Sequence, residues 1–316
     1  MIVYTNIEFN DSQRQHMREV ADEDVVYFAD PENPSLQDKD AFLKAEIALG
    51  NCAPEWLPLT RGLRWMQFDS VGVGEYTHLN WDELGTRLTC TNLRGFFAMP
   101  VAETVLGGIL TLYRGLDRLL KLRADRSWKK LELRSQLRSL SEAKVIILGY
   151  GATGKKVHSL LGPFGCTVIP VDKSERAPDV EGVNELDRFL PLADIVVAAL
   201  PDTPKTRGLF GEQRFVMLKK GAIFVNVGRG SLVDEAALIN ALSSGHLRGA
   251  VIDVTREEPI SPNHPLWDAP NAVLTQHTAG GTFDELERKL QFFEQNLSRY
   301  RRGDALENVV NWKRGY

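Results

Sequence analysis

Polar side chains that could do chemistry together stand at the ends of apolar runs in the second half of the chain. Arg229 directly follows AIFVNVG, and His277 ends AVLTQH. Between them, Asp253, Glu257 and Glu258 come at or just after the end of GAVIDV. Because ligands of open α/β sheets bind at the carboxyl ends of strands, these residues are candidates for one site. Taken singly, each has a structural alternative: an arginine that caps a helix, glutamates solvated in a loop, or a packed histidine.

The residue types suit proton transfer beside hydride transfer. A histidine can give or take a proton near neutral pH. A neighbouring carboxylate favours the charged form of the ring and fixes its orientation. An arginine can hold a substrate carboxylate at two points and polarise the adjacent carbonyl. With a nicotinamide as the hydride source, this set predicts the interconversion of a 2-keto acid and a 2-hydroxy acid.

A glycine pattern supplies the nicotinamide site. In KVIILGYGATGKKV, Gly149, Gly151 and Gly154 form G-x-G-x-x-G between an expected strand and an expected helix, where a pyrophosphate can approach the backbone. The next apolar run ends in Asp172, about 18 residues further on, which can accept hydrogen bonds from ribose hydroxyls and repels a 2′-phosphate. The sequence therefore predicts NAD in preference to NADP, although Lys173 weakens that preference. The alternative is a glycine turn in a sheet that binds nothing.

The elements that must position these residues are predicted from hydrophobic pattern. Near-continuous apolar runs indicate parallel strands covered on both faces, and shorter runs indicate a second α/β unit at the N-terminus. Apolar residues at helical spacing predict one long amphipathic helix over 101–122 and another over 281–303. The expected strands lie within 1–7, 25–30, 45–50, 63–70, 87–92, 144–151, 166–172, 194–201, 222–228, 249–254 and 272–277.

Bulk properties narrow the class of protein. The 316 residues suffice for two domains, and the net charge of −4 gives no electrostatic reason to expect nucleic acid or a membrane surface as partner. The basic stretch 113–138 is expected to be a solvated or subunit-contacting helix. Cys52, Cys90 and Cys166 form no close pair and no metal-ligand spacing, which favours a reducing compartment without a bound metal. With no secretory signal and no run of about 18 apolar residues, a cytoplasmic protein is expected.

Six segments together resemble the D-isomer-specific 2-hydroxyacid dehydrogenase family, over most of the chain. They are LRWMQFDSVGVGEY, PVAETVLGGILTLYRGL, ALPDTPKTRGLF, VNVGRGSLVDE, GAVIDVTREEP and PLWDAPNAVLTQHTAG. The resemblance implies that Arg229, Glu258 and His277 are catalytic, with Glu258 chosen over Glu257 because it precedes Pro259.

The resemblance also implies binding residues. Backbone amides around Val71 and Gly72 would grip the substrate carboxylate, with Arg229 and His277 completing the substrate site. Asp253 would contact the nicotinamide amide. The implied cofactor-binding residues are Thr104, Gly149, Tyr150, Gly151, Ala152, Thr153, Gly154, Asp172, Leu200, Pro201, Thr206, Val227, Asp253, His277 and Gly280.

The fold implied by the resemblance is two Rossmann-like or flavodoxin-like domains with doubly wound parallel sheets and an active site in the interdomain cleft. Residues 1–99 plus 281–316 would form a discontinuous substrate-binding domain, and 100–280 the NAD-binding domain. A homodimer is expected through the 101–138 region, where Trp128 is a candidate to approach the partner's active site or to pack at the interface.

The sequence departs from the family's usual pattern at three places. Thr153 stands where the family usually has an aliphatic residue, and Gln276 where it often has a proline. A third departure is RSWKK, which lacks the glycine usual before that tryptophan, and none of the three removes a chemical group. The family's formate dehydrogenases carry glutamine at the position of Glu258, which favours a proton-transferring enzyme here.

A dinucleotide-sensing corepressor-like protein and a phosphoglycerate dehydrogenase-like enzyme are alternative functions. Glyoxylate, hydroxypyruvate, pyruvate and an aryl-pyruvate are not distinguished as substrates, nor is the physiological direction.

Overall fold

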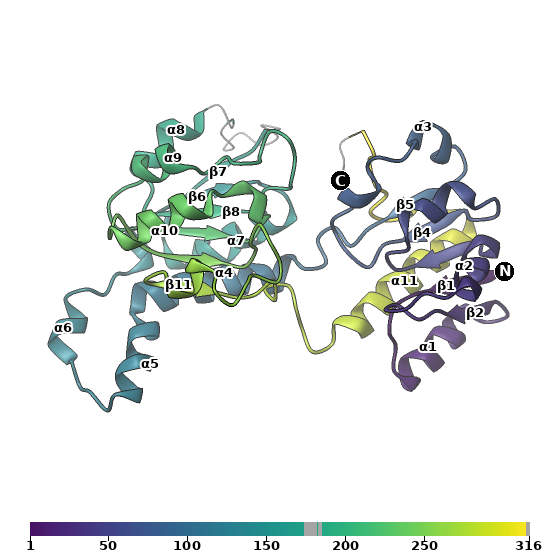
Figure 1. Cartoon of the computed structure of the whole chain (residues 1–316), viewed down its shortest axis with the longest axis horizontal. Helices are drawn as coiled ribbons and strands as arrows, with labels where there is room; N and C mark the ends of the chain where they lie inside the picture. The colour runs from purple at the N-terminus through teal and green to yellow at the C-terminus, as the bar shows by residue number, and fades with distance from the viewer. Residues whose placement is uncertain (174–181, 183–184, 314–316) are drawn as a thin grey trace. The chain divides into compact units, whose positions relative to one another are not determined.

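The structure, a computed structural model, describes residues 1–173, 182 and 185–313, arranged in two units (Figure 1). The flanking unit comprises Met1–Phe96 and Thr282–Tyr316, and the central unit comprises Phe97–Gly281. Residues 314–316, at the end of the predicted substrate-binding segment, lie outside the described residues. Each sheet is entirely parallel, so the predicted fold class of two parallel α/β units is confirmed.

The central unit is a six-stranded sheet in the order β11-β10-β9-β8-β6-β7. The strand order reverses between β6 and β8, which is the position where doubly wound sheets bind ligands. Its strands are β6 (Lys144–Leu148), β7 (Thr167–Val171), β8 (Ile195–Ala198), β9 (Ala222–Asn226), β10 (Leu247–Ile252) and β11 (Ala272–Leu274). Its helices are α4 (Ala98–Arg114), α5 (Leu116–Ala124), α6 (Lys130–Arg134), α7 (Ala152–Leu161), α8 (Leu186–Phe189), α9 (Glu212–Met217) and α10 (Glu235–Ser243).

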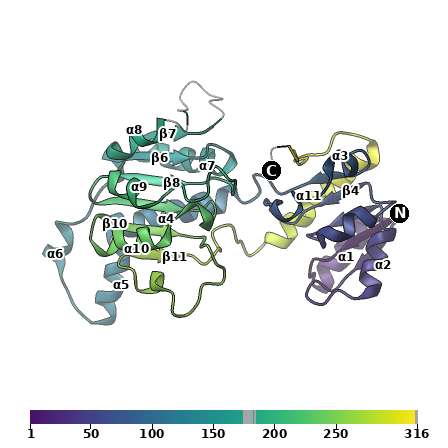
Figure 2. The ribbon, with the colours of Figure 1, turned by 45° about the horizontal axis from the view of Figure 1, so that its top comes forward.

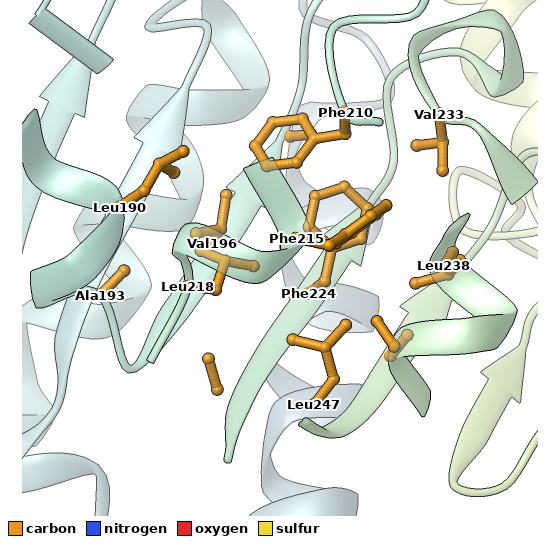
Figure 3. Close-up of a cluster of buried hydrophobic side chains, with 14 of the residues drawn as sticks. Leu190, Ala193, Val196, Phe210, Phe215, Leu218, Phe224, Val233, Leu238 and Leu247 are labelled. Carbon is orange, nitrogen blue, oxygen red and sulfur yellow. The ribbon is translucent and has the colours of Figure 1, made fainter. Parts of the chain in front are cut away.

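Alternation along the central strands divides the buried side chains into two cores. Side chains such as Val196 and Phe224 face a core completed by α8, α9 and α10, where the rings of Phe210, Phe215 and Phe224 pack together (Figure 3). The opposite face packs against α4 and α7. Because both faces of the sheet are covered, its strands are apolar throughout, as the sequence pattern predicted.

The flanking unit is a five-stranded sheet in the order β2-β1-β3-β4-β5. Helix α11 returns from the C-terminal part of the chain to cover one face, where Phe293 stacks on Trp65 with ring centroids 5.1 Å apart. The strands are β1 (Ile2–Thr5), β2 (Val25–Phe28), β3 (Ile47–Leu49), β4 (Trp65–Gln67) and β5 (Thr89–Thr91). The helices are α1 (Asp11–Ala21), α2 (Leu36–Lys44), α3 (Trp81–Leu84) and α11 (Glu285–Arg302).

Three sequence predictions need correction. The basic stretch 113–138, expected to be one helix, contains the end of α4, all of α5 and α6, and a loop between them. The helix predicted over 101–122 is two helices, because Gly115 takes a left-handed conformation (φ +64°) that ends α4 and precedes α5. The run before His277, predicted to be a buried strand, is a half-buried one, since β11 lies at the edge of its sheet.

Helices α5 and α6 project from the body of the central unit (Figures 1 and 2). The two helices contribute no buried residue. Their exposed apolar side chains include Leu120 and Leu131, and Trp128, in the loop between the helices, is 92% exposed.

The three cysteines of the chain are free. None of the described helices has the length and apolar character needed to cross a bilayer.

Candidate active site

Strand register brings the predicted site segments to one edge of the central sheet. Leu148 pairs with both Val171 and Ala198, and the same row continues through Asn226, Ile252 and Leu274. The chain leaves every strand directly after this row. The segments that begin there contain Gly149, Asp172, Leu200, Val227, Asp253 and His277.

His277 and Glu258 form a hydrogen-bonded pair at this edge. His277 Nδ1 donates to Glu258 Oε2 over 2.6 Å, and the second carboxylate oxygen accepts from the backbone amide of Thr255 at 2.9 Å. Of the two adjacent glutamates, Glu257 contributes its backbone carbonyl, which accepts from the Thr255 hydroxyl. With Nδ1 committed to the carboxylate, the Nε2 edge of the ring is available for proton exchange, and the His277 side chain is 56% exposed.

Asp253 holds the loop that carries the histidine. Its Oδ1 accepts from the hydroxyl of Thr275 (2.6 Å) and the amide of Ala279 (3.1 Å), and its carbonyl accepts from the amide of His277 (2.7 Å). Gln276 and His277 both have positive φ, +53° and +57°, a conformation that side chains disfavour without such support. Asp253 therefore anchors both sides of a tight turn with His277 at its tip.

Arg229 lies in a turn after β9 whose backbone packs closely against the backbone of the loop after β10. Its carbonyl accepts from Asn226 Nδ2 (3.0 Å), and its Nη1 donates to the carbonyl of Gly228 (2.7 Å). A Cβ on Gly230 would meet the Thr255 carbonyl group at 1.9 Å, so only glycine allows this approach. The segments carrying Arg229 and the Glu258 carboxylate are thereby packed backbone to backbone.

The glycine pattern has the geometry of a phosphate-binding turn. Gly149 has φ +91°, and a Cβ there would meet the carbonyl oxygen of Ala199 at 2.6 Å. A Cβ on Gly151 would meet nothing within 4 Å, which leaves open space at the start of α7. Ala152, Thr153 and Gly154 form the first turn of α7, whose N-terminus has no side-chain cap. Its amides and positive dipole end suit an anion.

The acidic end of β7 is linked to the glycine turn. Asp172 Oδ2 accepts from the backbone amide of Tyr150 at 2.8 Å. This bond places the carboxylate beside the turn, where a ribose next to a bound pyrophosphate would be met. The residues present therefore fit a dinucleotide.

The loop after β8 contains three of the predicted cofactor residues. Leu200 and Pro201 leave the strand, and the Thr206 hydroxyl donates back to the Pro201 carbonyl at 2.7 Å. Asp202 accepts from Arg207 Nε (2.8 Å) and from the Ser231 hydroxyl (3.0 Å). These bonds, above all the one from Arg207, lower the pKa of Asp202.

The remaining predicted residues lie in both units. The Thr104 hydroxyl on α4 donates to the carbonyl of Ala279 (3.3 Å), and Gly280 packs against the ring of Phe97. Val71 and Gly72 belong to the flanking unit, in the loop after β4.

A pocket of about 420 Å³ lies beside the His277–Glu258 pair. Its lining mixes the polar residues of the pair with apolar side chains from the ends of β10 and β11 and from the following loop. It is lined by Ile252, Asp253, Thr255, Glu258, Pro259, Ile260, Trp267, Leu274, Gln276 and His277. No group of three potential metal ligands occurs in the described part of the chain.

Some supporting residues were missed by the sequence reasoning. Asn226, 1% exposed, accepts from the Gly228 amide and donates to the Arg229 carbonyl, so it shapes the turn that presents the arginine. Thr275 and Thr255 support the histidine and the glutamate. A polar residue at the end of an apolar strand was a signal for Asn226, but the hydrogen bonds of both threonines depend on the fold.

Comparisons with known proteins agree on one family, to which this chain belongs. Residues 106–279 match the model of the D-isomer specific 2-hydroxyacid dehydrogenase NAD binding domain. A glyoxylate reductase of Thermofilum pendens is 30% identical over 293 residues, which is 88% of this chain and 83% of that protein. A formate dehydrogenase of Arabidopsis thaliana is 32% identical over 71% of this chain, and the match spans 60% of that protein's length.

A solved structure matches along the whole chain. It is an NADPH-dependent glyoxylate/hydroxypyruvate reductase from Sinorhizobium meliloti in complex with NADP and sulfate. The TM-score is 0.83 at 26% identity, covering 100% of this chain and 99% of that one.

Proposed function

Since this chain belongs to the D-isomer specific 2-hydroxyacid dehydrogenase family, we propose that it interconverts a small 2-keto acid and the D-2-hydroxy acid. The observation that carries the proposal is the His277–Glu258 hydrogen bond at the same sheet edge as Arg229 and the glycine turn. The family match shows that the chain is an oxidoreductase of this family. Its substrate and the roles of its residues are our proposal.

We assign a role to each proposed catalytic residue. His277 donates a proton to the carbonyl oxygen during reduction and accepts one from the hydroxyl during oxidation. Glu258 fixes the orientation of the ring through its hydrogen bond to Nδ1. Arg229 and the amides around Val71 and Gly72 hold the substrate carboxylate. The dinucleotide, when bound, supplies or takes up the hydride.

NAD is proposed as the cofactor in preference to NADP. The Asp172 carboxylate accepts a hydrogen bond from the Tyr150 amide of the glycine turn, and this supports the proposal because a carboxylate next to the ribose would repel a 2′-phosphate. The Sinorhizobium meliloti relative is NADPH-dependent, so this preference separates the present chain from that enzyme. The proposed dinucleotide contacts are the turn 149–154, the loop residues Leu200, Pro201 and Thr206, and Thr104, Val227, Asp253, His277 and Gly280.

A hydroxyacid substrate is proposed in preference to formate. Formate oxidation needs no proton transfer to a carbonyl oxygen, and the resemblance implies glutamine beside the histidine in formate dehydrogenases. This chain has Glu258 there, and its carboxylate is hydrogen bonded to His277. The pair is therefore suited to proton exchange with a hydroxyl or carbonyl group.

The test is the loss of NADH absorbance with a panel of 2-keto acids, for the wild type and His277→Ala. We expect at least one keto acid to be reduced, faster with NADH than with NADPH. The variant should lose roughly 10³-fold or more in kcat while still binding NADH, because the other proposed dinucleotide contacts remain. Tight NADH binding without turnover of any keto acid would contradict the proposed activity.

We also propose a homodimer formed through 101–138. Helices α5 and α6 carry exposed apolar side chains and bury none, as expected of a surface that packs on a second copy. Trp128 is proposed to lie in that interface. Sedimentation of the wild type should give twice the 35.4 kDa chain mass, and Leu120→Ser with Leu131→Ser should shift it toward the monomer. A monomeric wild type would contradict this proposal.

A further inference from the structure

Two carbonyl groups of the loop after β4 are held from the side of β5. The carbonyl of Ser70 accepts from the amide of Leu93 at 3.0 Å, and the carbonyl of Val71 accepts from Asn92 Nδ2 at 2.9 Å. Both donors come directly after β5. The loop backbone is thus fixed at two successive peptide groups.

Fixing these carbonyls also fixes the direction of two amides. A trans peptide is planar, and its C=O and N–H point in opposite directions. The Ser70 carbonyl shares its plane with the amide of Val71, and the Val71 carbonyl shares its plane with the amide of Gly72. Both N–H groups therefore point away from β5. They are the amides proposed above to grip the substrate carboxylate, so the inference rests on the proposed function.

Asn92 is itself held in place. It is 3% exposed, and its backbone amide donates to the carbonyl of Asn308 (3.1 Å). Its side-chain Oδ1 accepts from the backbone amide of Arg94 (3.2 Å). Asn308 in turn donates through Nδ2 to the carbonyl of Arg94 (2.9 Å). A residue near the C-terminal end of the chain thereby closes a hydrogen-bonded ring around the donor to Val71.

The tail over 308–312 is anchored at both of its ends. The amide of Val310 donates to the carbonyl of Cys90 at 2.9 Å, which lays the tail along β5. Trp312 stacks on Trp81 with ring centroids 3.5 Å apart and an interplanar angle of 6°.

The same tail touches both sides of the substrate loop. Trp312 meets Phe68, which precedes the loop, edge to face at 6.2 Å. Its stacking partner Trp81 donates through Nε1 to the carbonyl of Tyr76, which follows the loop. The tail therefore bridges the two ends of the segment that carries Val71 and Gly72.

We propose that Asn92 and the 308–312 tail form a clamp that positions the Val71 and Gly72 amides for the substrate carboxylate. Asn92 and Trp312 are positioning residues, because they act through the loop and do not touch the substrate. Amides that are already oriented bind an anion without the cost of ordering them at each turnover.

The experiment compares Asn92→Ala, Trp312→Ala and Trp312→Phe with Phe9→Leu, a change in the other core of the same unit, where α11 packs. For each protein, KM and kcat are measured with the best 2-keto acid. Calorimetric titration of oxamate into the enzyme–NADH complex gives a second readout, because oxamate carries the carboxylate without being reduced. Thermal melts record any loss of stability.

We expect Asn92→Ala to raise KM and the oxamate Kd by about tenfold, the equivalent of one charge-assisted hydrogen bond, with kcat within about threefold. Trp312→Ala should shift both in the same direction, and Trp312→Phe should restore them. Phe9→Leu should lower the melting temperature while leaving both constants unchanged.

The outcomes separate the clamp from the activity. Unchanged KM and oxamate affinity in Asn92→Ala and Trp312→Ala would overturn the clamp, as would the same increases in Phe9→Leu. A wild type that binds oxamate but turns over no keto acid would contradict the proposed function, and the affinities of the variants would still decide the clamp. Wild-type protein that neither binds oxamate nor turns over any keto acid would overturn both.

Discussion

At the scale of single residues, Asp253 supports the histidine through three contacts. One carboxylate oxygen accepts hydrogen bonds from the Thr275 hydroxyl and the Ala279 amide, and the Asp253 carbonyl accepts one from the His277 amide. The turn thus depends on a short side-chain bond, from Thr275, that lies two residues from the proposed proton donor. Changing that bond alters the position of His277 without removing a reacting group.

Thr275→Val keeps the shape of the side chain and removes its hydroxyl. Because the Asp253 carboxylate then loses one of its two donors, the turn loosens, and we expect kcat to fall by about tenfold. Stopped-flow measurement of NADH oxidation checks this, with NADH affinity expected to stay within about twofold. Thr275→Ser is the matched control, since it keeps the hydroxyl and should retain most of the activity. Equal rates in the valine and serine variants would contradict the role given to this bond.

Asp69 gives a prediction with a defined dependence on pH. Burial raises the pKa of the Asp69 carboxyl above its ordinary value of 3.8, against the opposing attraction of Lys289. A raised folded-state pKa contributes stability below the ordinary value and loses it as pH rises through the folded value. Above that value the ionised carboxylate is a net cost to the folded state.

Asp69→Asn should therefore melt at a higher temperature than the wild type at pH 7. The difference should shrink as pH falls and vanish below about pH 3.8, where the wild-type carboxyl is also neutral. Thermal melts at a series of pH values check this, with the exposed Asp82→Asn as control. A lower melting temperature for Asp69→Asn at pH 7 would show that its pairing with Lys289, which also bonds Glu285, outweighs its burial.

At the scale of elements, the sequence predicted the strands better than the helix boundaries. The apolar runs of the inner strands were found because a strand covered on both faces must be apolar throughout. The break at Gly115 was missed, because a helical pattern continues on both sides of it and glycine alone does not reveal a positive φ. The order of the strands brings the segments that carry Arg229, Glu258 and His277 out after the adjacent strands β9, β10 and β11, and their joint action stays a proposal. The Asn92–Asn308 bonds join residues far apart in the sequence, so no local pattern could predict them.

Gly115 and Gly107 give opposite expectations for the same substitution. Gly115 has φ +64°, so alanine there should lower the free energy of unfolding by about 1 kcal/mol. Gly107 lies inside α4, and a Cβ there would meet nothing within 4 Å, so alanine should raise the free energy of unfolding by roughly 0.5–1 kcal/mol. Urea unfolding of both variants measures the two changes. Stabilisation by Gly115→Ala would mean that α4 and α5 can join as one helix.

At the scale of the whole molecule, the tryptophans are divided unevenly between the units. Trp56, Trp65, Trp81 and Trp312 belong to the flanking unit, and Trp65 is fully buried. The two in the central unit are Trp128 and Trp267, and both are exposed. Tryptophan emission therefore reports mainly on unfolding of the flanking unit, whereas calorimetry reports on both.

NAD⁺ should stabilise the two units unequally. At a concentration of 100 times its Kd, a ligand adds about 2.7 kcal/mol to the unit that binds it. We expect the calorimetric transition of the central unit to move to higher temperature, while the transition seen by tryptophan emission moves much less. The same scans without the dinucleotide are the control. Equal shifts by both probes would mean that the units unfold as one cooperative body.

The return of α11 to the flanking unit has a consequence for protein synthesis. The first strands leave the ribosome early, yet Val3 and Trp65 lie in a core that also needs Phe293 and Leu297. The central unit is one continuous stretch, Phe97–Gly281, and can close as soon as it has emerged. The N-terminal sheet must wait, with one apolar face uncovered, until the last segment is made. This order is opposite to the usual N-terminal-first folding, so we expect the N-terminal sheet to expose apolar surface for longer than the central unit does.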